Sequence, residues 1–460
     1  MATITPIDQR PDQSLKRGSR RPRIVIVGAG FGGLTAAQAL GGAPADVTVI
    51  DHSNHFVFQP LLYQVATAEL SPADISAPIR GVLRHKRNIR TLLAEVTSVD
   101  PKRRVVIARD PNEGREHAVP YDYLVLATGA RESYFGHEQW AEWAPGLKDN
   151  VDATRIRRRI LLAFETAELE PSPERARTLM TFIVVGGGPT GVELAGAIAE
   201  LARKAIRRDF RAIDTTQTRV ILVEAGPRLL PQFPEELARK AKQALERMGV
   251  EVRQGVAVKD VNETGALIGD EWTEAGTVIW AAGVRASSAA AWVGAPTDRA
   301  GRAQVKPDLT VPGHSEIYII GDTASALGKD GRPFPGVAPV AMQQGRYVAR
   351  ALRTRIAAGG ASAPIAPFHY FDRGYLATIG RTYAVGLVGP LRLSGLIAWF
   401  VWAGVHISYL IGFRNRALVL AQWFWRYLAF QWAARLIAGP TGAREPRGVE
   451  RRATSASSAR

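Results

Sequence analysis

The 460-residue sequence contains no cysteine. This absence excludes structural disulfides, thiolate metal sites, cysteine nucleophiles and dithiol redox relays. Any oxidation–reduction chemistry would therefore have to be carried by a bound cofactor. The eight histidines are scattered, and although His52 and His55 lie three residues apart, no third histidine stands near them, so we expect no metal site.

Acidic residues are scarce relative to basic ones, 43 against 59, which gives a formal net charge of +16. The excess is concentrated at the two ends, because residues 1–23 carry six basic and two acidic residues, and residues 391–460 carry ten and two. A nucleic-acid binder more often spreads a basic stripe over a folded face, so we expect no nucleic-acid partner. The first 21 residues lack the apolar stretch of a secretory signal, which indicates a disordered lead-in and a cytoplasmic location.

A strand–turn–helix pattern opens the folded part of the chain. The β-branched run 23–27 leads into Gly-Ala-Gly-Phe-Gly-Gly at 28–33 and then a helical segment, and a second strand ends in Asp51, 18 residues after Gly33. Such a turn brings a pyrophosphate to the helix N-terminus and an acid to the ribose hydroxyls. The pattern predicts a nucleotide site made of Gly28, Gly30, Gly33 and Asp51, although Asp51 could also be a plain turn or helix cap.

The same pattern returns about 158 residues later. A strand at 181–185 leads into Gly-Gly-Gly-Pro-Thr-Gly at 186–191, and the next strand ends in Glu224, 33 residues after Gly191, so the connection is longer than in the first unit. This predicts a second nucleotide site. An acid at Glu224 would repel the extra phosphate of NADPH and favours NADH, while Arg228 nearby leaves NADPH open. The residues of this site are Gly186, Gly188, Gly191 and Glu224, and Glu224, like Asp51, could also be a plain turn or helix cap.

Further apolar strands complete the predicted fold. Segments 121–130 and 277–283 each end in a small-residue turn and would each close one nucleotide unit, and segment 317–322 brings Asp322 to the carboxyl end of a strand. The fold class is α/β, with two Rossmann-like dinucleotide-binding domains and a C-terminal membrane-associating region. The expected divisions are a lead-in at 1–21, a first domain in two parts at 22–150 and 286–390, a second domain at 151–285, a membrane-associating region at 391–438 and a disordered tail at 439–460.

In this order, the motifs GAGFGG, LATGA, GGGPTGVE, WAAG and IIGD resemble those of the two-dinucleotide-domain flavoprotein oxidoreductases, which bind FAD on the first unit and NAD(P)H on the second. Within that group, His-Phe-Val-Phe-Gln-Pro-Leu-Leu-Tyr-Gln-Val-Ala at 55–66 and Ala-Pro-Val-Ala-Met-Gln-Gln-Gly at 338–345 resemble the type II NADH:quinone oxidoreductases. These are single-subunit respiratory enzymes that do not pump protons. The resemblance covers about residues 22–435.

The resemblance implies roles for individual residues. FAD would be held by the first glycine turn and Asp51, lined by Thr128 and Gly129, with Asp322 on its ribityl chain, and NADH would be held by the second turn and Glu224. Glu193 would lie near the nicotinamide and flavin rings, and Gln343 and Gln344 would border the quinone. Taken alone, Glu193 could also be a first-turn helix acid, and the two glutamines could be surface amides.

One position departs from the family pattern. The family commonly has Ala-Gln-x-x-x-Gln, and Pro339 replaces the first glutamine here. This replacement puts the quinone contacts near Pro339 in doubt.

The implied reaction is hydride transfer from NADH to FAD, followed by two-electron reduction of a membrane quinone without proton pumping. Relatives that reduce disulfides or oxidise sulfide need cysteines and are excluded. Two alternatives stay open: a soluble NADH-dependent flavoprotein that delivers electrons to oxygen or to a protein, and a flavin-binding regulatory protein without turnover.

The C-terminal part of the chain has its own pattern. Residues 393–413 carry no formal charge, Arg414 and Arg416 follow, and residues 391–437 hold five of the ten tryptophans. Tryptophan rings at the headgroup level and cations on anionic lipid are typical of an interfacial segment. We therefore expect residues 391–438 to attach the enzyme peripherally to the cytoplasmic face of the cell membrane. A single span, packing within a soluble protein and a homodimer contact are the alternatives.

Overall fold

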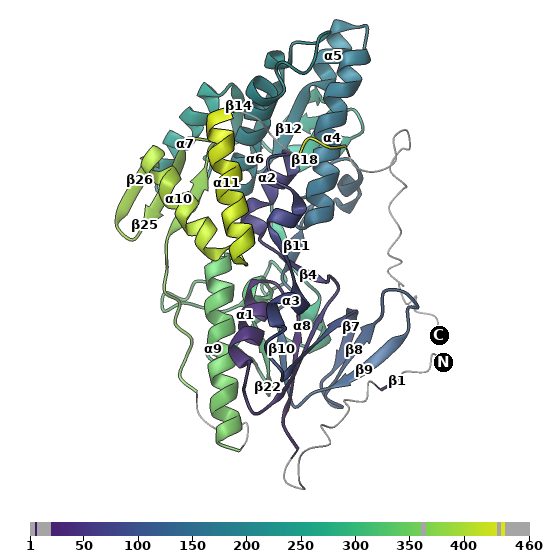
Figure 1. Cartoon of the computed structure of the whole chain (residues 1–460), viewed down its shortest axis with the longest axis vertical. Coiled ribbons are helices and arrows are strands. Elements are labelled where there is room, and N and C mark those ends of the chain that lie inside the picture. Colours follow the sequence, from purple (N-terminus) through teal and green to yellow (C-terminus); the bar gives the residue numbers. More distant parts are fainter. Residues whose placement is uncertain (1–4, 7–19, 360–364, 430–433, 438–460) are drawn as a thin grey trace.

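The computed structural model describes residues 5–6, 20–359, 365–429 and 434–437, without the side chains of residues 5–6, 413–414 and 425–429. Two α/β units lie one above the other along the long axis of the molecule (Figure 1). The chain crosses from the first unit to the second and back again. The crossings run side by side as an antiparallel pair of short strands, β11 (Ala130–Glu132) and β19 (Val284–Ala286).

The first unit is built on a six-stranded sheet of five parallel strands, with one antiparallel strand at an edge. Its central strand is β-branched and buried on both faces, with Ile24, Val25 and Ile26 fully inaccessible to solvent. The strand order is β21 (Thr310–Val311), β22 (His314–Ile319), β10 (Tyr123–Leu126), β2 (Arg23–Val27), β3 (Asp46–Asp51) and β6 (Ile89–Leu93).

Two helices cross closely on one face of this sheet, α1 (Phe31–Leu40) and α9 (Ala338–Ala357). A Cβ on Gly345 would overlap the Gly32 carbonyl oxygen, so the close crossing needs a glycine there. Arg353 of α9 donates to the carbonyl oxygens of Ala39 and Gly41, each at 2.9 Å through Nη2, which satisfies main-chain groups at the end of α1. The long helix therefore fixes the helix that follows the first glycine turn.

The second unit repeats the plan with a four-stranded parallel sheet. Its helix α6 (Pro189–Glu200) follows the second glycine turn, and a single π-helical turn at Leu201–Ala205 succeeds it. A loop and a 3₁₀ turn at Thr215–Gln217 then complete the longer connection that the sequence predicted. The strand order is β14 (Val250–Gln254), β13 (Arg219–Glu224), β12 (Thr181–Val185) and β18 (Thr277–Trp280).

Smaller sheets and helices surround the two units. The remaining helices are α2 (Leu62–Ala66), α3 (Ile79–Leu83), α4 (Asn150–Leu169), α5 (Pro173–Leu179), α7 (Glu235–Arg247), α8 (Ala289–Trp292), α10 (Leu396–Tyr409) and α11 (Phe413–Ala429). The remaining strands are β1 (Thr5–Pro6), β4 (His55–Val57), β5 (Ser76–Pro78), β7 (Glu95–Asp100), β8 (Val105–Arg109), β9 (Glu116–Pro120), β15 (Val258–Asn262), β16 (Gly265–Ile268), β17 (Glu271–Glu274), β20 (Ala303–Gln304), β23 (Ala324–Ser325), β24 (Tyr375–Thr378), β25 (Ala384–Val388) and β26 (Leu391–Gly395).

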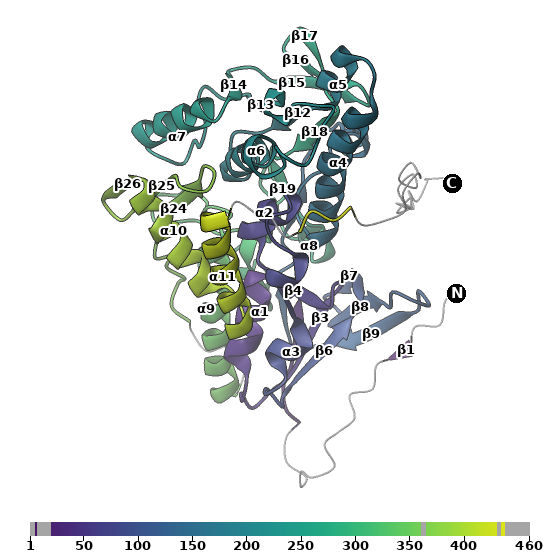
Figure 2. The ribbon, with the colours of Figure 1, turned by 45° about the horizontal axis from the view of Figure 1, so that its top comes forward.

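The ends of the chain compare with the expected divisions as follows. The expected tail at 439–460 lies outside the described residues, as does most of the lead-in, of which Thr5–Pro6 pairs with β9. The expected boundary after residue 390 falls in the turn between β25 and β26, so the first five residues of the expected membrane region belong to a sheet. Of the two helices that follow, α10 lies beside that sheet and α11 lies beside α10 (Figure 2).

The structure also bears on the spanning alternative for this region. Within the described part of the chain, none of the helices combines the length and the apolar character needed to cross a bilayer.

Candidate active site

The first glycine turn has the geometry of a nucleotide cradle. Gly28 has a φ of +94°, and a Cβ on Gly33 would overlap the Gly28 carbonyl oxygen, so neither position accepts a side chain. By contrast, nothing lies within 4 Å of a Cβ on Gly30, which leaves the N-terminus of α1 open. At the end of β3, Asp51 accepts hydrogen bonds from the Ala29 N–H at 2.6 Å and the Ser53 N–H at 2.7 Å. This open, glycine-lined helix start fits a dinucleotide pyrophosphate.

The second turn reproduces this arrangement. Gly186 has a φ of +112°, a Cβ on Gly191 would overlap its carbonyl oxygen, and the space at Gly188 is open. Glu224, at the end of β13, accepts from the Gly187 N–H at 2.5 Å and the Gly226 N–H at 2.6 Å. Each unit therefore places a carboxylate at the end of its second strand, where it holds the middle of the glycine turn and lies in reach of a ribose.

Residues far apart in the sequence meet beside the first turn. The Thr128 hydroxyl lies 2.5 Å from that of Ser287, and the Gly129 carbonyl oxygen accepts from the Thr323 hydroxyl at 3.1 Å. Asp322 stands in a 3₁₀ turn directly after β22. Burial raises its pKa above the ordinary value, an effect that the charges of Lys148 and Arg302 oppose. The structure thus brings Thr128, Gly129 and Asp322 together at the carboxyl ends of neighbouring strands, where the sequence placed them.

The two glutamines of α9 are both engaged with the main chain. Gln344 is buried, and its side-chain oxygen accepts from the Gly321 N–H at 2.6 Å, next to Asp322. Gln343 donates to the Phe371 carbonyl oxygen and accepts from the Phe371 N–H, both at 2.9 Å. Pro339 lies in the first turn of α9, where a missing N–H breaks no helical hydrogen bond. The amides therefore hold two segments of chain in place.

Glu193 lies on α6 with its carboxylate facing β24. It is 8% exposed and accepts one hydrogen bond, from the Thr378 N–H at 3.3 Å. Burial raises its pKa from the ordinary value of 4.5 to about 8, and the Thr378 N–H opposes this only in part. The side chain is therefore mostly protonated at neutral pH.

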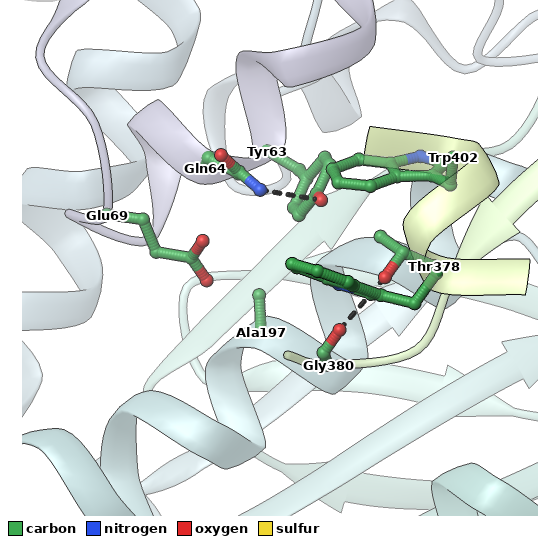
Figure 3. Close-up of a pocket in the computed structure, with 8 residues that line it drawn as sticks. Tyr63, Gln64, Glu69, Ala197, Thr378, Gly380 and Trp402 are labelled. Atoms are coloured by element: carbon green, nitrogen blue, oxygen red, sulfur yellow. Dashed lines mark hydrogen bonds between the residues drawn. The ribbon is translucent and has the colours of Figure 1, made fainter. Parts of the chain in front are cut away.

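A small cavity adjoins Glu193 through Thr378, and the sequence did not single it out. Figure 3 shows Gln64 donating to the Tyr63 hydroxyl at 2.9 Å on one side and Thr378 donating to the Gly380 carbonyl oxygen at 2.9 Å on the other. The cavity has room for about one water molecule. One feature of the sequence could have pointed to this cavity, because the polar residues Gln64 and Glu69 interrupt a largely apolar run. The lining residues are Tyr63, Gln64, Glu69, Ala197, Thr378, Gly380, Trp399 and Trp402.

The C-terminal tryptophans do not lie where the sequence led us to expect. Trp399, Trp402 and Trp423 are 8%, 1% and 4% exposed, so the expectation that these three rings sit at lipid headgroups is wrong. Trp402 stacks on Trp423 with ring centroids 5.1 Å apart, and the Trp423 indole N–H donates to the Gln64 side-chain oxygen at 3.0 Å. The bond satisfies the Trp423 N–H and the buried amide oxygen, whereas the Trp402 N–H, also buried, has no hydrogen-bond partner among the described residues. The side chain of Trp425 and all of Trp432 lie outside the described residues.

The surface of this region is apolar instead through aliphatic and phenylalanine side chains. Ile397 and Phe400 of α10 are 70% and 62% exposed, and Leu420 and Phe424 of α11 are 50% and 66% exposed. Their spacing of three or four residues gives each helix one apolar outer face. Burial against the tryptophans lowers the pKa of His406 to about 4, so this histidine adds no charge to α10 at neutral pH.

The raised pKa of Glu193 predicts a pH-dependent stability. The unfolded chain loses the proton near pH 4.5 and the folded protein near pH 8, so stability falls as the pH rises through this interval. Glu193→Gln does not ionise, and it should gain more than about 1 kcal/mol in unfolding free energy relative to the original protein between pH 4.5 and 8. Urea unfolding at several pH values measures this difference.

The exposed Glu174→Gln serves as the control and should show no such trend. A difference between Glu193→Gln and the original protein that stays constant with pH would contradict the assignment of a protonated, buried Glu193.

The pyridine nucleotide-disulphide oxidoreductase model matches residues 22–345. The type II NADH:quinone oxidoreductases Ndh and NdhA of Mycobacterium tuberculosis are 44% and 42% identical, over 89% and 88% of this chain and 89% and 86% of theirs. The structure of NDH2 from Plasmodium falciparum in complex with NADH has a TM-score of 0.81 at 23% identity, covering 91% of this chain and all of that one. The cysteine-free chain belongs to the pyridine nucleotide-disulphide oxidoreductase family and, within it, to the type II NADH:quinone oxidoreductases.

Proposed function

We propose that this protein oxidises NADH and reduces a membrane quinone through a bound FAD, without pumping protons. The observation that carries this proposal is the repeated glycine turn, in which Asp51 and Glu224 hold equivalent N–H groups in a chain that has no cysteine to relay electrons. When bound, FAD accepts a hydride from NADH and gives up two electrons to the quinone. The relatives named above as type II NADH:quinone oxidoreductases support the same reaction.

The first unit is assigned to FAD and the second to NADH. Gly28, Gly30, Gly33 and Asp51 would hold the adenosine diphosphate half of FAD, with Thr128, Gly129 and Asp322 along the rest of the molecule. In the second unit the Glu224 carboxylate, already bonded to Gly187 and Gly226, would meet the ribose hydroxyls of NADH and repel a phosphate. Arg228 donates through Nη2 to the Pro231 carbonyl oxygen at 2.9 Å, so part of its guanidinium is engaged within the protein.

In quinone reduction, the side chains of the protein position the quinone and transfer a proton to it. Gln344 and Gln343 border the quinone. They act as positioning residues, because their amides hold the main chain at Gly321 and Phe371. Reduction of a quinone to a quinol takes up two electrons and two protons; the hydride of NADH brings both electrons and one proton, and solvent supplies the other proton. Glu193, protonated at neutral pH and linked through Thr378 to a water-sized cavity, would pass on this second proton and regain it from water.

Attachment to the membrane follows from the substrate and from the exposed apolar faces of α10 and α11. A long-chain quinone stays in the bilayer, so the enzyme must lie on that surface to reach it. The outer side chains Ile397, Phe400, Leu420 and Phe424 would enter the lipid, whereas the buried tryptophans would support them from beneath. We place the protein peripherally on the cytoplasmic face of the cell membrane.

The test of the reaction is an oxygen-free assay of NADH and NADPH oxidation with a short-chain quinone. We expect turnover with NADH and at least about tenfold lower kcat/KM with NADPH, because Glu224 repels the added phosphate. Glu224→Ser should reduce the preference for NADH over NADPH, whereas Arg228→Gln should leave this preference unchanged. No NADH oxidation with the quinone in this assay, followed by oxidation once oxygen is admitted, would contradict the proposal and favour the soluble oxidase.

Membrane attachment is tested with the double variant Ile397→Glu/Phe424→Glu. Each change removes an apolar contact worth about 1.5–3 kcal/mol when buried, so binding to anionic phospholipid vesicles should fall at least about tenfold. Vesicle flotation measures the binding. Turnover with a short-chain quinone should persist because both side chains are exposed.

Leu169→Glu is the matched control, because Leu169 is 83% exposed on α4 and takes no part in the proposed surface. Equal flotation of the double variant and this control would contradict attachment through α10 and α11.

A further inference from the structure

Phe135 is unusual in two respects: its large apolar side chain is exposed, and its backbone has a conformation that phenylalanine rarely adopts. It follows β11, its side chain is 68% exposed, and its φ is +54°, a left-handed conformation that bulky residues rarely adopt. A large apolar side chain in such a conformation usually marks strain that serves a function. The question is which ligand the exposed ring could contact.

The neighbours of Phe135 hold it in this place. Its ring covers Gly283, since a Cβ on Gly283 would lie 2.5 Å from the ring Cζ. The ring centroid is 6.3 Å from that of Trp280, which is buried and donates through its indole N–H to the Ser133 carbonyl oxygen at 2.9 Å. The Ser133 N–H donates in turn to the Gly283 carbonyl oxygen at 3.3 Å. The loop is therefore tied to the segment that follows β18, while 68% of the Phe135 side chain stays exposed.

The strand order of the second sheet indicates which site the segment after β18 borders. In the order β14-β13-β12-β18, the reversal of strand order lies between β12 and β18, and open α/β sheets bind ligands at that point, outside the carboxyl ends of the strands. The second glycine turn leaves β12 there, and a Cβ on Gly186 would lie 2.6 Å from the Ala281 carbonyl oxygen. Glu224 takes the adenine-side ribose on β13, so the β18 side is left for the nicotinamide half.

We propose that Phe135 is a binding residue for the nicotinamide half of NADH, which its exposed ring covers by flat apolar contact. The inference rests on the proposed NADH site of the second unit. A planar ring held in advance beside the turn loses water-exposed area when the dinucleotide binds, and it loses little side-chain freedom because its neighbours already fix it. Val284, which follows Gly283 in the chain, is exposed as well, to 49%.

The test is calorimetric titration of the oxidised, FAD-loaded protein with NAD⁺, which binds without reducing the flavin. Phe135→Ala should weaken NAD⁺ binding about three- to tenfold, as expected for one aromatic contact. Phe135→Gly should weaken it equally without lowering the melting temperature, because glycine adopts the left-handed conformation freely. Phe135→Tyr keeps the ring and should keep the affinity. The KM for NADH should rise in the first two variants, with kcat nearly unchanged.

Controls separate this inference from the site on which it rests. Leu169→Ala, at an exposed position on α4, should leave NAD⁺ binding unchanged. If Glu224→Ala weakens NAD⁺ binding but Phe135→Ala and Phe135→Gly do not, the role of Phe135 is overturned and the NADH site stands. If Glu224→Ala has no effect either, the NADH site itself is overturned. A fall in melting temperature with Phe135→Gly that accounts for the weaker binding would make the role structural and would also overturn the inference.

Discussion

Everything in this structure depends on the absence of side chains at two helix starts. In each unit the last glycine of the turn lies against the carbonyl oxygen of the first, so a single methyl group would push the helix away from the strand. With the methyl group absent, the first N–H groups of the helix face open space, and an acid from the next strand braces the turn from behind. The strand order of each sheet fixes where its helix begins. The long helix α9 holds α1 in place, and the paired strands β11 and β19 connect the two units.

Local patterns made most of this predictable from the sequence. The glycine turns, the strands that flank them and the terminal acids Asp51 and Glu224 are specified within about 40 residues of each other, and the structure places them as expected. Contacts between distant segments were not predictable in the same way. That Gln344 holds Gly321, and that Thr378 bonds Glu193, depends on which elements pack together, and a residue's type does not reveal this.

The C-terminal tryptophans show even more clearly that residue type does not reveal contacts between distant segments. A run of tryptophans next to arginines has the composition of an interfacial segment, yet three of the five rings are buried. Composition reports that an indole ring needs an apolar neighbour and a partner for its N–H, and both a bilayer interface and a protein core supply these. For Trp423 the Gln64 side chain supplies this acceptor inside the protein, whereas Trp402 is buried by its ring contacts although its N–H has no partner among the described residues. Since α2 also lines the cavity beside Glu193, the C-terminal helices and the candidate reaction site share one short helix.

The central claim is that electrons enter this protein from NADH and leave to a quinone through one bound flavin. The most direct test is an oxygen-free titration of the purified protein, first with NADH and then with a short-chain quinone, while the flavin spectrum is recorded. The account predicts that NADH bleaches the flavin absorbance and that the quinone restores it. A flavin that stays bleached after the quinone is added, or a protein that carries no flavin at all, would contradict it.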